Sequence, residues 1–141
     1  MLPYARCMTN SQIAIVVSDT YPDITGKMLE AAQNKAKELN AAILKVEHVP
    51  GCFEIPLAVK RMLTLGHVDG VVTLGAIIQG ETAHDEVISH SVANALMQLS
   101  LEFNKPVALG ISGPRMTRQQ AVARIEKISV NAVKACIEMI R

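Results

Sequence analysis

Hydrophobic residues follow two alternating patterns along the chain. Short runs rich in Val and Ile, each bounded by turn residues, predict four strands at residues 13–17, 43–49, 71–74 and 107–111. Between these runs, apolar residues recur every three to four positions, which predicts amphipathic helices. The same period continues from residue 117 to residue 141 and predicts one long helix at the end of the chain.

Four βα units in succession predict a parallel sheet with right-handed crossovers and helices on both faces. The expected fold class is therefore α/β, a flavodoxin-like three-layer αβα sandwich with a four-stranded parallel sheet. Four strands are too few to close a barrel. Residues 13–141 are expected to form a single domain, preceded by a flexible N-terminal arm at residues 1–12. A small open sheet leaves edges to cover, so we also expect subunit association.

Composition narrows the classes of function. The 141 residues carry a formal net charge of +1 and only 3% aromatic residues, which argues against a nucleic-acid partner. Three cysteines without a CxxC pair predict neither a disulfide framework nor a zinc site, and they suit a reducing cytoplasm. No apolar run approaches the roughly 20 residues of a membrane-spanning helix, so no membrane partner is expected.

The segment from Gly75 to Glu86 carries the most informative chemistry. It joins the third predicted strand to a helix, and ligands of open α/β sheets bind beyond the carboxyl ends of the strands. Its glycines allow close backbone approach, Thr82 offers a hydroxyl, and the amides that open a helix favour an anion. His84 is then a candidate general acid or base. The alternative is an ordinary helix start with an incidental histidine.

The segment at residues 49–56 surrounds Cys52, Phe53 and Glu54 with two prolines and a glycine. It is either a turn followed by a helix start, or a site whose amides contact a planar heterocycle while Glu54 binds hydroxyl groups. A catalytic role for Cys52 is the weaker interpretation, because no base can be named for it. The ring of Tyr21, after the first strand, either stacks on a flat ligand or covers the core.

Basic residues gather near the start of the last predicted helix. A bidentate guanidinium is the preferred partner of a phosphate, but the pattern alone does not select one arginine. Arg118 and Lys127 are interpreted as solvated charges. The four residues are Arg115, Arg118, Arg124 and Lys127.

Taken together, three segments resemble the lumazine synthase family of riboflavin biosynthesis, in its short archaeal form. They are VPGCFEIPLAVK at residues 49–60, VVTLGAIIQGETAHDEVISHSVANAL at residues 71–96, and KPVALGISGPRMTRQQAVARI at residues 105–125. The resemblance runs from about residue 13 to the C-terminus and preserves the order and spacing of the motifs.

The resemblance implies a transferase that uses no metal and no cofactor. Its substrates would be 5-amino-6-(D-ribitylamino)uracil and 3,4-dihydroxy-2-butanone 4-phosphate, and its products 6,7-dimethyl-8-ribityllumazine, phosphate and water. The step is the penultimate one of riboflavin biosynthesis. The family also implies a homo-oligomer, either a pentamer or a 60-subunit shell, with substrate bound between neighbouring subunits.

The resemblance also implies roles for individual residues. His84 falls on the proton donor, and Arg124 falls on the phosphate-binding arginine that is contributed to the neighbouring site. Glu81 and Thr82 occupy phosphate-loop positions. The remaining substrate contacts implied are Tyr21, Cys52, Phe53, Glu54, Ala76, Ile77, Ile78 and Leu109.

Three positions depart from the family pattern. Thr20 stands where the family has a stacking aromatic residue, with Tyr21 one place later, and Leu109 stands where many relatives have Phe. Glu81 places a carboxylate near the phosphate. The Thr20 and Leu109 departures leave open a flavin or lumazine carrier or shell protein without activity. The archaeal-type riboflavin synthase, which is related to this fold, is a second alternative.

Overall fold

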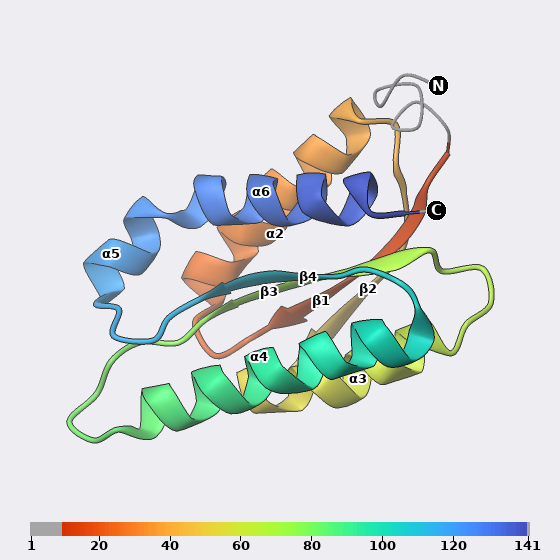
Figure 1. The fold of residues 1–141 in the computed structure, drawn as a ribbon. Coiled ribbons are helices and arrows are strands. Elements are labelled where there is room, and N and C mark those ends of the chain that lie inside the picture. The colour runs from red at the N-terminus through yellow and green to blue at the C-terminus, as the bar shows by residue number, and fades with distance from the viewer. Residues whose placement is uncertain (1–9, 141) are drawn as a thin grey trace.

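Four parallel strands form the central layer of the computed structural model, which describes residues 10–140 (Figure 1). Their order across the sheet is β2-β1-β3-β4. The parallel α/β prediction is therefore confirmed. The strands are β1 (Gln12–Ser18), β2 (Ala42–Val49), β3 (Gly70–Ala76) and β4 (Val107–Ser112).

Helices cover both faces of this sheet. Helices α2 (Pro22–Glu38) and α6 (Ile125–Glu138) lie on one face, with the short α5 (Arg118–Ala123) at the end of the same layer (Figure 1). Helices α3 (Ile55–Leu63) and α4 (His84–Phe103) lie on the other face. A single 3-10 turn, η1 (Cys52–Glu54), connects β2 to α3.

The two faces of the sheet bury separate hydrophobic clusters. Alternate residues of β1 point to opposite sides, so Ile15 packs against α2 and α6, whereas Val16 packs against α3 and α4. Both side chains are fully buried. Continuous apolar runs in β1 and β3 are typical of strands covered on both faces, and they place these two strands at the centre of the sheet.

The predicted long C-terminal helix is wrong in one respect, because it is broken at Arg124. This residue has φ −103° and ψ 3° and separates α5 from α6. A capping box between Thr117 and Gln120 begins α5. The apolar period continues across the break, since Ala121 and Ile125 pack against the same cluster. The hydrophobic pattern therefore could not reveal the break.

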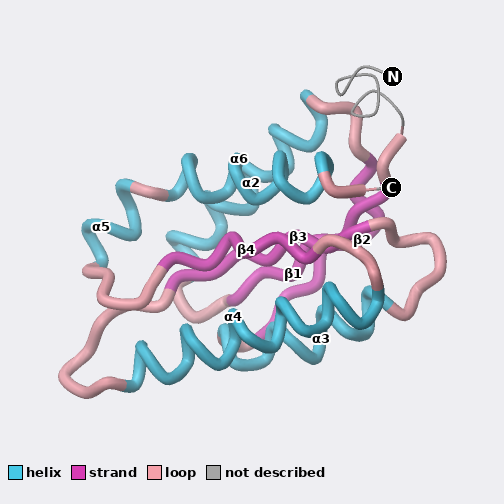
Figure 2. Tube along the Cα trace, viewed as in Figure 1, coloured by secondary structure: helices cyan, strands magenta, loops and turns pink. Residues whose placement is uncertain are grey.

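The third and fourth strands extend further than predicted, and their ends carry the loops of interest. Gly75 pairs with Ile111 and Ala76 pairs with Ser112, so regular pairing continues past residue 74. The loops that follow β3 and β4 leave from the same end of the sheet (Figure 2). The topology thus collects the candidate chemistry at the carboxyl ends of the strands.

The predicted N-terminal arm at residues 1–12 lies largely outside the described residues, which start at residue 10, and β1 already begins at Gln12. Among the helices of residues 10–140, none is long and apolar enough to cross a membrane.

Candidate functional site

A cavity of about 220 Å³ lies at the carboxyl ends of β1, β2 and β3. Four segments that are distant in sequence contribute to it: the loop after β1, the loop and turn after β2, the end of β3, and the first turns of α4. Its lining residues are Thr20, Tyr21, Gly51, Cys52, Phe53, Glu54, Ala76, Ile77, Ile78, His84, Asp85 and Ile88. Most of the predicted site residues therefore meet in one place.

Cys52 is buried against the strand ends. Burial raises the pKa of the Cys52 thiol above its ordinary value, and hydrogen bonds from Ser18 and the backbone of Ala76 offset only part of this effect. A Cβ atom on Gly75 would lie 2.6 Å from Cys52 Sγ, so only glycine admits this close approach. The thiol stays protonated at neutral pH and serves as a wall of the cavity rather than as a nucleophile.

Phe53 and Glu54 stand on the turn between β2 and α3. Phe53 is 63% exposed although it borders the cavity. The Glu54 amide donates to the Gly51 carbonyl at 3.2 Å. That amide is engaged in the turn, which leaves the Glu54 carboxylate as the group available to a ligand hydroxyl.

The loops after β1 and β2 are tied to each other. The Asp19 amide donates to the Val49 carbonyl at 2.9 Å, and Thr20 Oγ1 donates to the Pro50 carbonyl at 3.1 Å. Thr20 lines the cavity beside Tyr21. Its hydroxyl thus fixes the loop in the place where relatives are expected to have an aromatic ring.

Ala76, Ile77 and Ile78 form an apolar wall of the cavity. The Ile77 amide donates to the Ser112 carbonyl at 2.8 Å, which continues the pairing of β3 with β4. The Gln79 amide donates to the Met116 carbonyl at 2.7 Å. These bonds hold the start of the 77–83 loop against the loop after β4.

His84 is the first residue of α4 and its exposed side chain borders the cavity. Its amide donates to Thr82 Oγ1 at 3.3 Å, which ties the helix start to the preceding loop. The predicted position of His84 at the opening of a helix is thereby confirmed. An imidazole at this place can exchange a proton with a ligand in the cavity.

Asp85 is a residue of this site whose position sequence analysis did not predict. Its carboxylate is only 4% exposed and accepts the Arg115 amide at 2.9 Å. Arg115 has a left-handed φ of 57°, and its Nε donates to Glu86 Oε1 at 2.8 Å. The start of α4 therefore anchors the loop after β4. A pairing 30 residues apart leaves no local signal in the sequence.

Tyr21 is half-buried, so it both packs against the core and lines the cavity. Arg118 is exposed, as its interpretation as a solvated charge requires, but it also makes specific contacts. Its guanidinium forms an ion pair with Asp23 and lies over the Tyr21 ring, with Cζ 5.9 Å from the ring centroid. This interaction joins α5 to the start of α2.

Four predicted site residues do not line the cavity of the single subunit. Glu81 and Thr82 lie in the exposed loop before α4. Leu109 is 54% exposed on the edge strand β4. Arg124 is exposed at the α5–α6 break, where its Nη1 donates to the Gln120 carbonyl at 3.4 Å. Both side chains are thus exposed on the surface of the single subunit.

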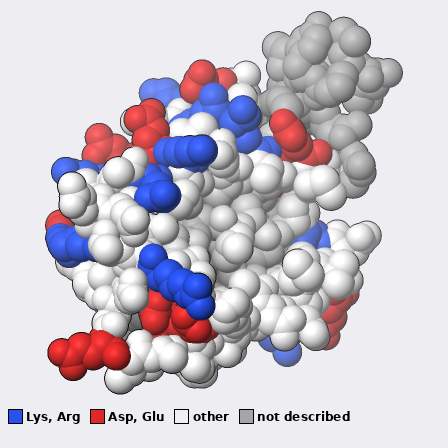
Figure 3. All heavy atoms as spheres, turned by 60° about the vertical axis from the view of Figure 1, so that its left-hand side comes forward, with Lys and Arg blue, Asp and Glu red and all other residues white. Residues whose placement is uncertain are grey.

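The charges around this end of the molecule are mixed. Figure 3 shows blue and red side chains interspersed with wide uncharged areas. Within residues 10–140, no group of three or more His, Cys, Asp or Glu side chains could hold a metal ion. The polar groups that line the cavity are the Thr20 and Tyr21 hydroxyls, the Glu54 and Asp85 carboxylates and the His84 imidazole.

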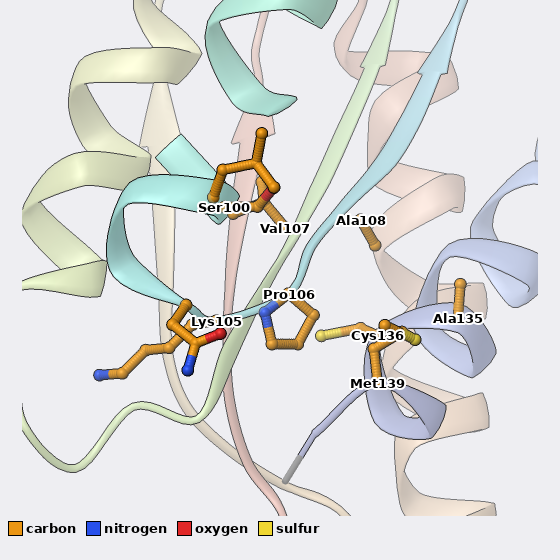
Figure 4. Close-up of a pocket in the computed structure, with 10 residues that line it drawn as sticks. Ser100, Lys105, Pro106, Val107, Ala108, Ala135, Cys136 and Met139 are labelled. Carbon is orange, nitrogen blue, oxygen red and sulfur yellow. The ribbon is translucent and has the colours of Figure 1, made fainter. Parts of the chain in front are cut away.

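A larger cavity of about 390 Å³ lies at the amino end of β4, between the ends of α4 and α6. Pro106, Cys136 and Met139 give it a largely apolar lining (Figure 4). Burial raises the pKa of Cys136 to about 12, so this thiol is inert at neutral pH. Lys105 Nζ is engaged with the Leu63 and Leu65 carbonyls, each at 3.3 Å. The cavity at the strand carboxyl ends is thus the better candidate.

Comparison with known proteins identifies a matching family. The family model for 6,7-dimethyl-8-ribityllumazine synthase matches residues 10–141. The protein of that name from Metallosphaera sedula is 54% identical over 130 residues, covering 92% of this chain and 86% of the relative. The corresponding proteins of Picrophilus torridus and Saccharolobus solfataricus are 48% and 46% identical over 92% of this chain, and over 95% and 84% of their own lengths.

Proposed function

Because the chain belongs to the 6,7-dimethyl-8-ribityllumazine synthase family of riboflavin biosynthesis, we propose that it carries out the condensation that the family name denotes. Its substrates are 5-amino-6-(D-ribitylamino)uracil and 3,4-dihydroxy-2-butanone 4-phosphate. Its products are 6,7-dimethyl-8-ribityllumazine, phosphate and water. The reaction proceeds through imine formation, phosphate elimination and ring closure.

The observation that supports this proposal is the convergence of Cys52, Phe53, Glu54 and His84 on one cavity at the strand carboxyl ends. An apolar wall and an aromatic ring suit a flat pyrimidine, and a carboxylate at the rim suits the hydroxyls of a ribityl chain. His84 stands at the side of the cavity from which the phosphate loop departs. Two substrates can therefore meet beside a group that exchanges protons.

His84 acts as the proton donor and acceptor in this proposal. Imine formation, elimination and ring closure each require protons to move at oxygen or nitrogen, and imidazole does so near neutral pH. The Thr82 hydroxyl, which accepts the His84 amide, keeps the start of α4 in place. Neither a metal nor an organic cofactor enters these steps.

Phosphate is bound by the 80–84 loop together with Arg124 of a neighbouring subunit. Arg124 is exposed and does not reach the cavity of its own chain, and the same holds for Leu109 on the edge strand. A guanidinium supplied across an interface completes the site with a bidentate phosphate contact. The assembly is a homo-oligomer, a pentamer or a 60-subunit shell, that works in the cytoplasm.

The test is product formation from the two precursors, measured by lumazine absorbance above the spontaneous condensation. The wild-type protein is expected to accelerate the reaction. A folded assembly that gives no excess lumazine contradicts the proposal. Lumazine alone is supplied as a second arm, since conversion to riboflavin would indicate the related riboflavin synthase, and tight binding without turnover would indicate a carrier.

A further inference from the structure

Arg118 lies over the ring of Tyr21, one of the two aromatic residues that line the cavity, and we propose that it is a positioning residue for the pyrimidine substrate. The proposal rests on the proposed function, because it assigns a partner to one wall of that site. Three side chains carry it: Arg118 at the start of α5, Asp23 in the first turn of α2, and Tyr21 immediately before α2.

The backbone of Tyr21 is fixed, but its ring needs a further constraint. The Tyr21 carbonyl accepts the Ile24 and Thr25 amides, each at 2.9 Å, and Thr25 Oγ1 at 3.1 Å. These bonds define where the side chain leaves the main chain. They do not set the rotation of the ring, which borders the cavity and is only half-buried.

Arg118 supplies that constraint. Its Cζ lies over the Tyr21 ring at 5.9 Å from the centroid, within the range of a cation–π interaction. The same guanidinium pairs with the Asp23 carboxylate, so it cannot rotate away without losing the ion pair. The capping box of Thr117 and Gln120 fixes the backbone from which Arg118 extends.

The arrangement explains how Tyr21 can still contribute its ring to the cavity, although it stands one residue after the position where the family has a stacking aromatic residue. Thr20 is bound to the Pro50 carbonyl and secures the loop, while Tyr21 presents its ring under the guanidinium. The guanidinium on one face polarises the ring and fixes its orientation beside a ligand in the cavity. In this proposal Arg118 acts through Tyr21, held by its ion pair with Asp23, and not by binding phosphate.

The kinetic test compares Arg118→Gln with wild type for each substrate separately. Loss of a partly exposed cation–π interaction corresponds to about a two- to five-fold change. We expect the KM for ribitylaminouracil to rise by this factor, with kcat and the KM for butanone phosphate nearly unchanged. Arg118→Lys should restore part of the loss. A rise confined to the KM of the phosphate substrate would show that Arg118 binds phosphate and would overturn the proposal.

Lys127→Gln is the matched control, because it removes a positive charge from an exposed position near the start of α6. It should leave both KM values unchanged. Tyr21→Leu is combined with Arg118→Gln in a double-mutant cycle. Effects on the KM for ribitylaminouracil should be strongly non-additive, and additive effects would overturn the proposal.

A spectroscopic readout is independent of the reaction. The chain has no Trp and two Tyr residues, so Tyr21 is the sole strong fluorophore in a Tyr4→Phe background. Quenching of its emission by acrylamide should increase in Arg118→Gln, and also in Asp23→Asn, which keeps the guanidinium and removes only its ion pair. Unchanged quenching in both variants would contradict the proposal even if no turnover were detected.

Discussion

His84 and Cys52 border the same cavity, but their surroundings assign them different roles. The thiol is buried, and its raised pKa keeps it neutral at pH 7, so it offers shape rather than reactivity. The imidazole is exposed at the start of α4 and can reach both solvent and ligand. In our proposal, the location of each side chain, more than its residue type, decides which one moves protons.

We expect His84→Gln to lower kcat by up to about 10²-fold, the lower end of the range for a positioned acid or base, with smaller changes in either KM. The measurement is steady-state lumazine formation with the spontaneous rate subtracted. His90→Gln is the control, since His90 is exposed on α4 and does not line the cavity. Equal losses in the two variants would argue against a specific role for His84.

The buried Cys136 thiol should make the free energy of unfolding fall at alkaline pH. Its pKa is raised from 9.0 to about 12 by burial, so the folded state keeps the thiol proton that the unfolded chain releases. The contribution is fully present below pH 9 and is lost as pH rises from 9 toward 12, with a limiting slope of about 1.4 kcal/mol per pH unit. Urea unfolding at pH 7.5 and pH 10 should show this loss in wild type.

The fall in the free energy of unfolding between pH 7.5 and pH 10 should be smaller in Cys136→Ala, however much the substitution destabilises the protein at neutral pH. Val133→Ala, which removes buried volume from the same helix but no ionisable group, should keep the wild-type slope. Identical pH dependence in Cys136→Ala and wild type would show that Cys136 does not titrate as described.

At the scale of elements, the apolar runs predicted the four strands and the hydrophobic period predicted the helices on both faces. The break at Arg124 was not predictable, because the residues on either side keep one helical stripe. The contact of Arg118 with Tyr21 and Asp23 and that of Asp85 with Arg115 were missed for another reason. They join residues far apart in the chain, and only the folded sheet brings them together.

Replacing glycine by alanine should have opposite effects on stability in a solvent-exposed helix and in a closely packed strand. Gly26 lies exposed within α2, and an added Cβ would meet no atom within 4 Å. In Gly110, on β4, an added Cβ would lie 2.2 Å from the Thr73 carbonyl oxygen. We expect Gly26→Ala to stabilise the protein by about 0.5–1 kcal/mol, and Gly110→Ala to destabilise it by about 2 kcal/mol or more.

Chemical denaturation of both variants checks this pair, with circular dichroism to confirm the fold. A neutral Gly110→Ala would mean that β3 and β4 can separate freely at this point, and the close packing of the sheet with Ala132 on α6 would then be wrong.

At the scale of the whole molecule, the exposed apolar residues indicate where copies meet. Leu101 is 77% exposed, Met97 is 65% exposed and Leu109 is 54% exposed, and they lie on α4 and on the edge strand β4. Large apolar side chains on a helix and an unpaired strand favour association. In our proposal, this apolar surface is covered by a neighbouring copy, and Leu109 and Arg124 contribute to the next site.

In our proposal, the cavity with His84 becomes an active site when a neighbouring copy supplies Arg124. The test mixes the impaired variants His84→Ala and Arg124→Ala in equal amounts under dissociating conditions, reassembles them, and follows lumazine formation above the rate of each variant reassembled alone. A site shared between neighbours predicts recovery to about a quarter of the wild-type rate, because one in four interfaces pairs an intact His84 with an intact Arg124. No recovery in fully reassembled mixtures, while reassembled wild type remains active, would show that neighbouring subunits do not share the site.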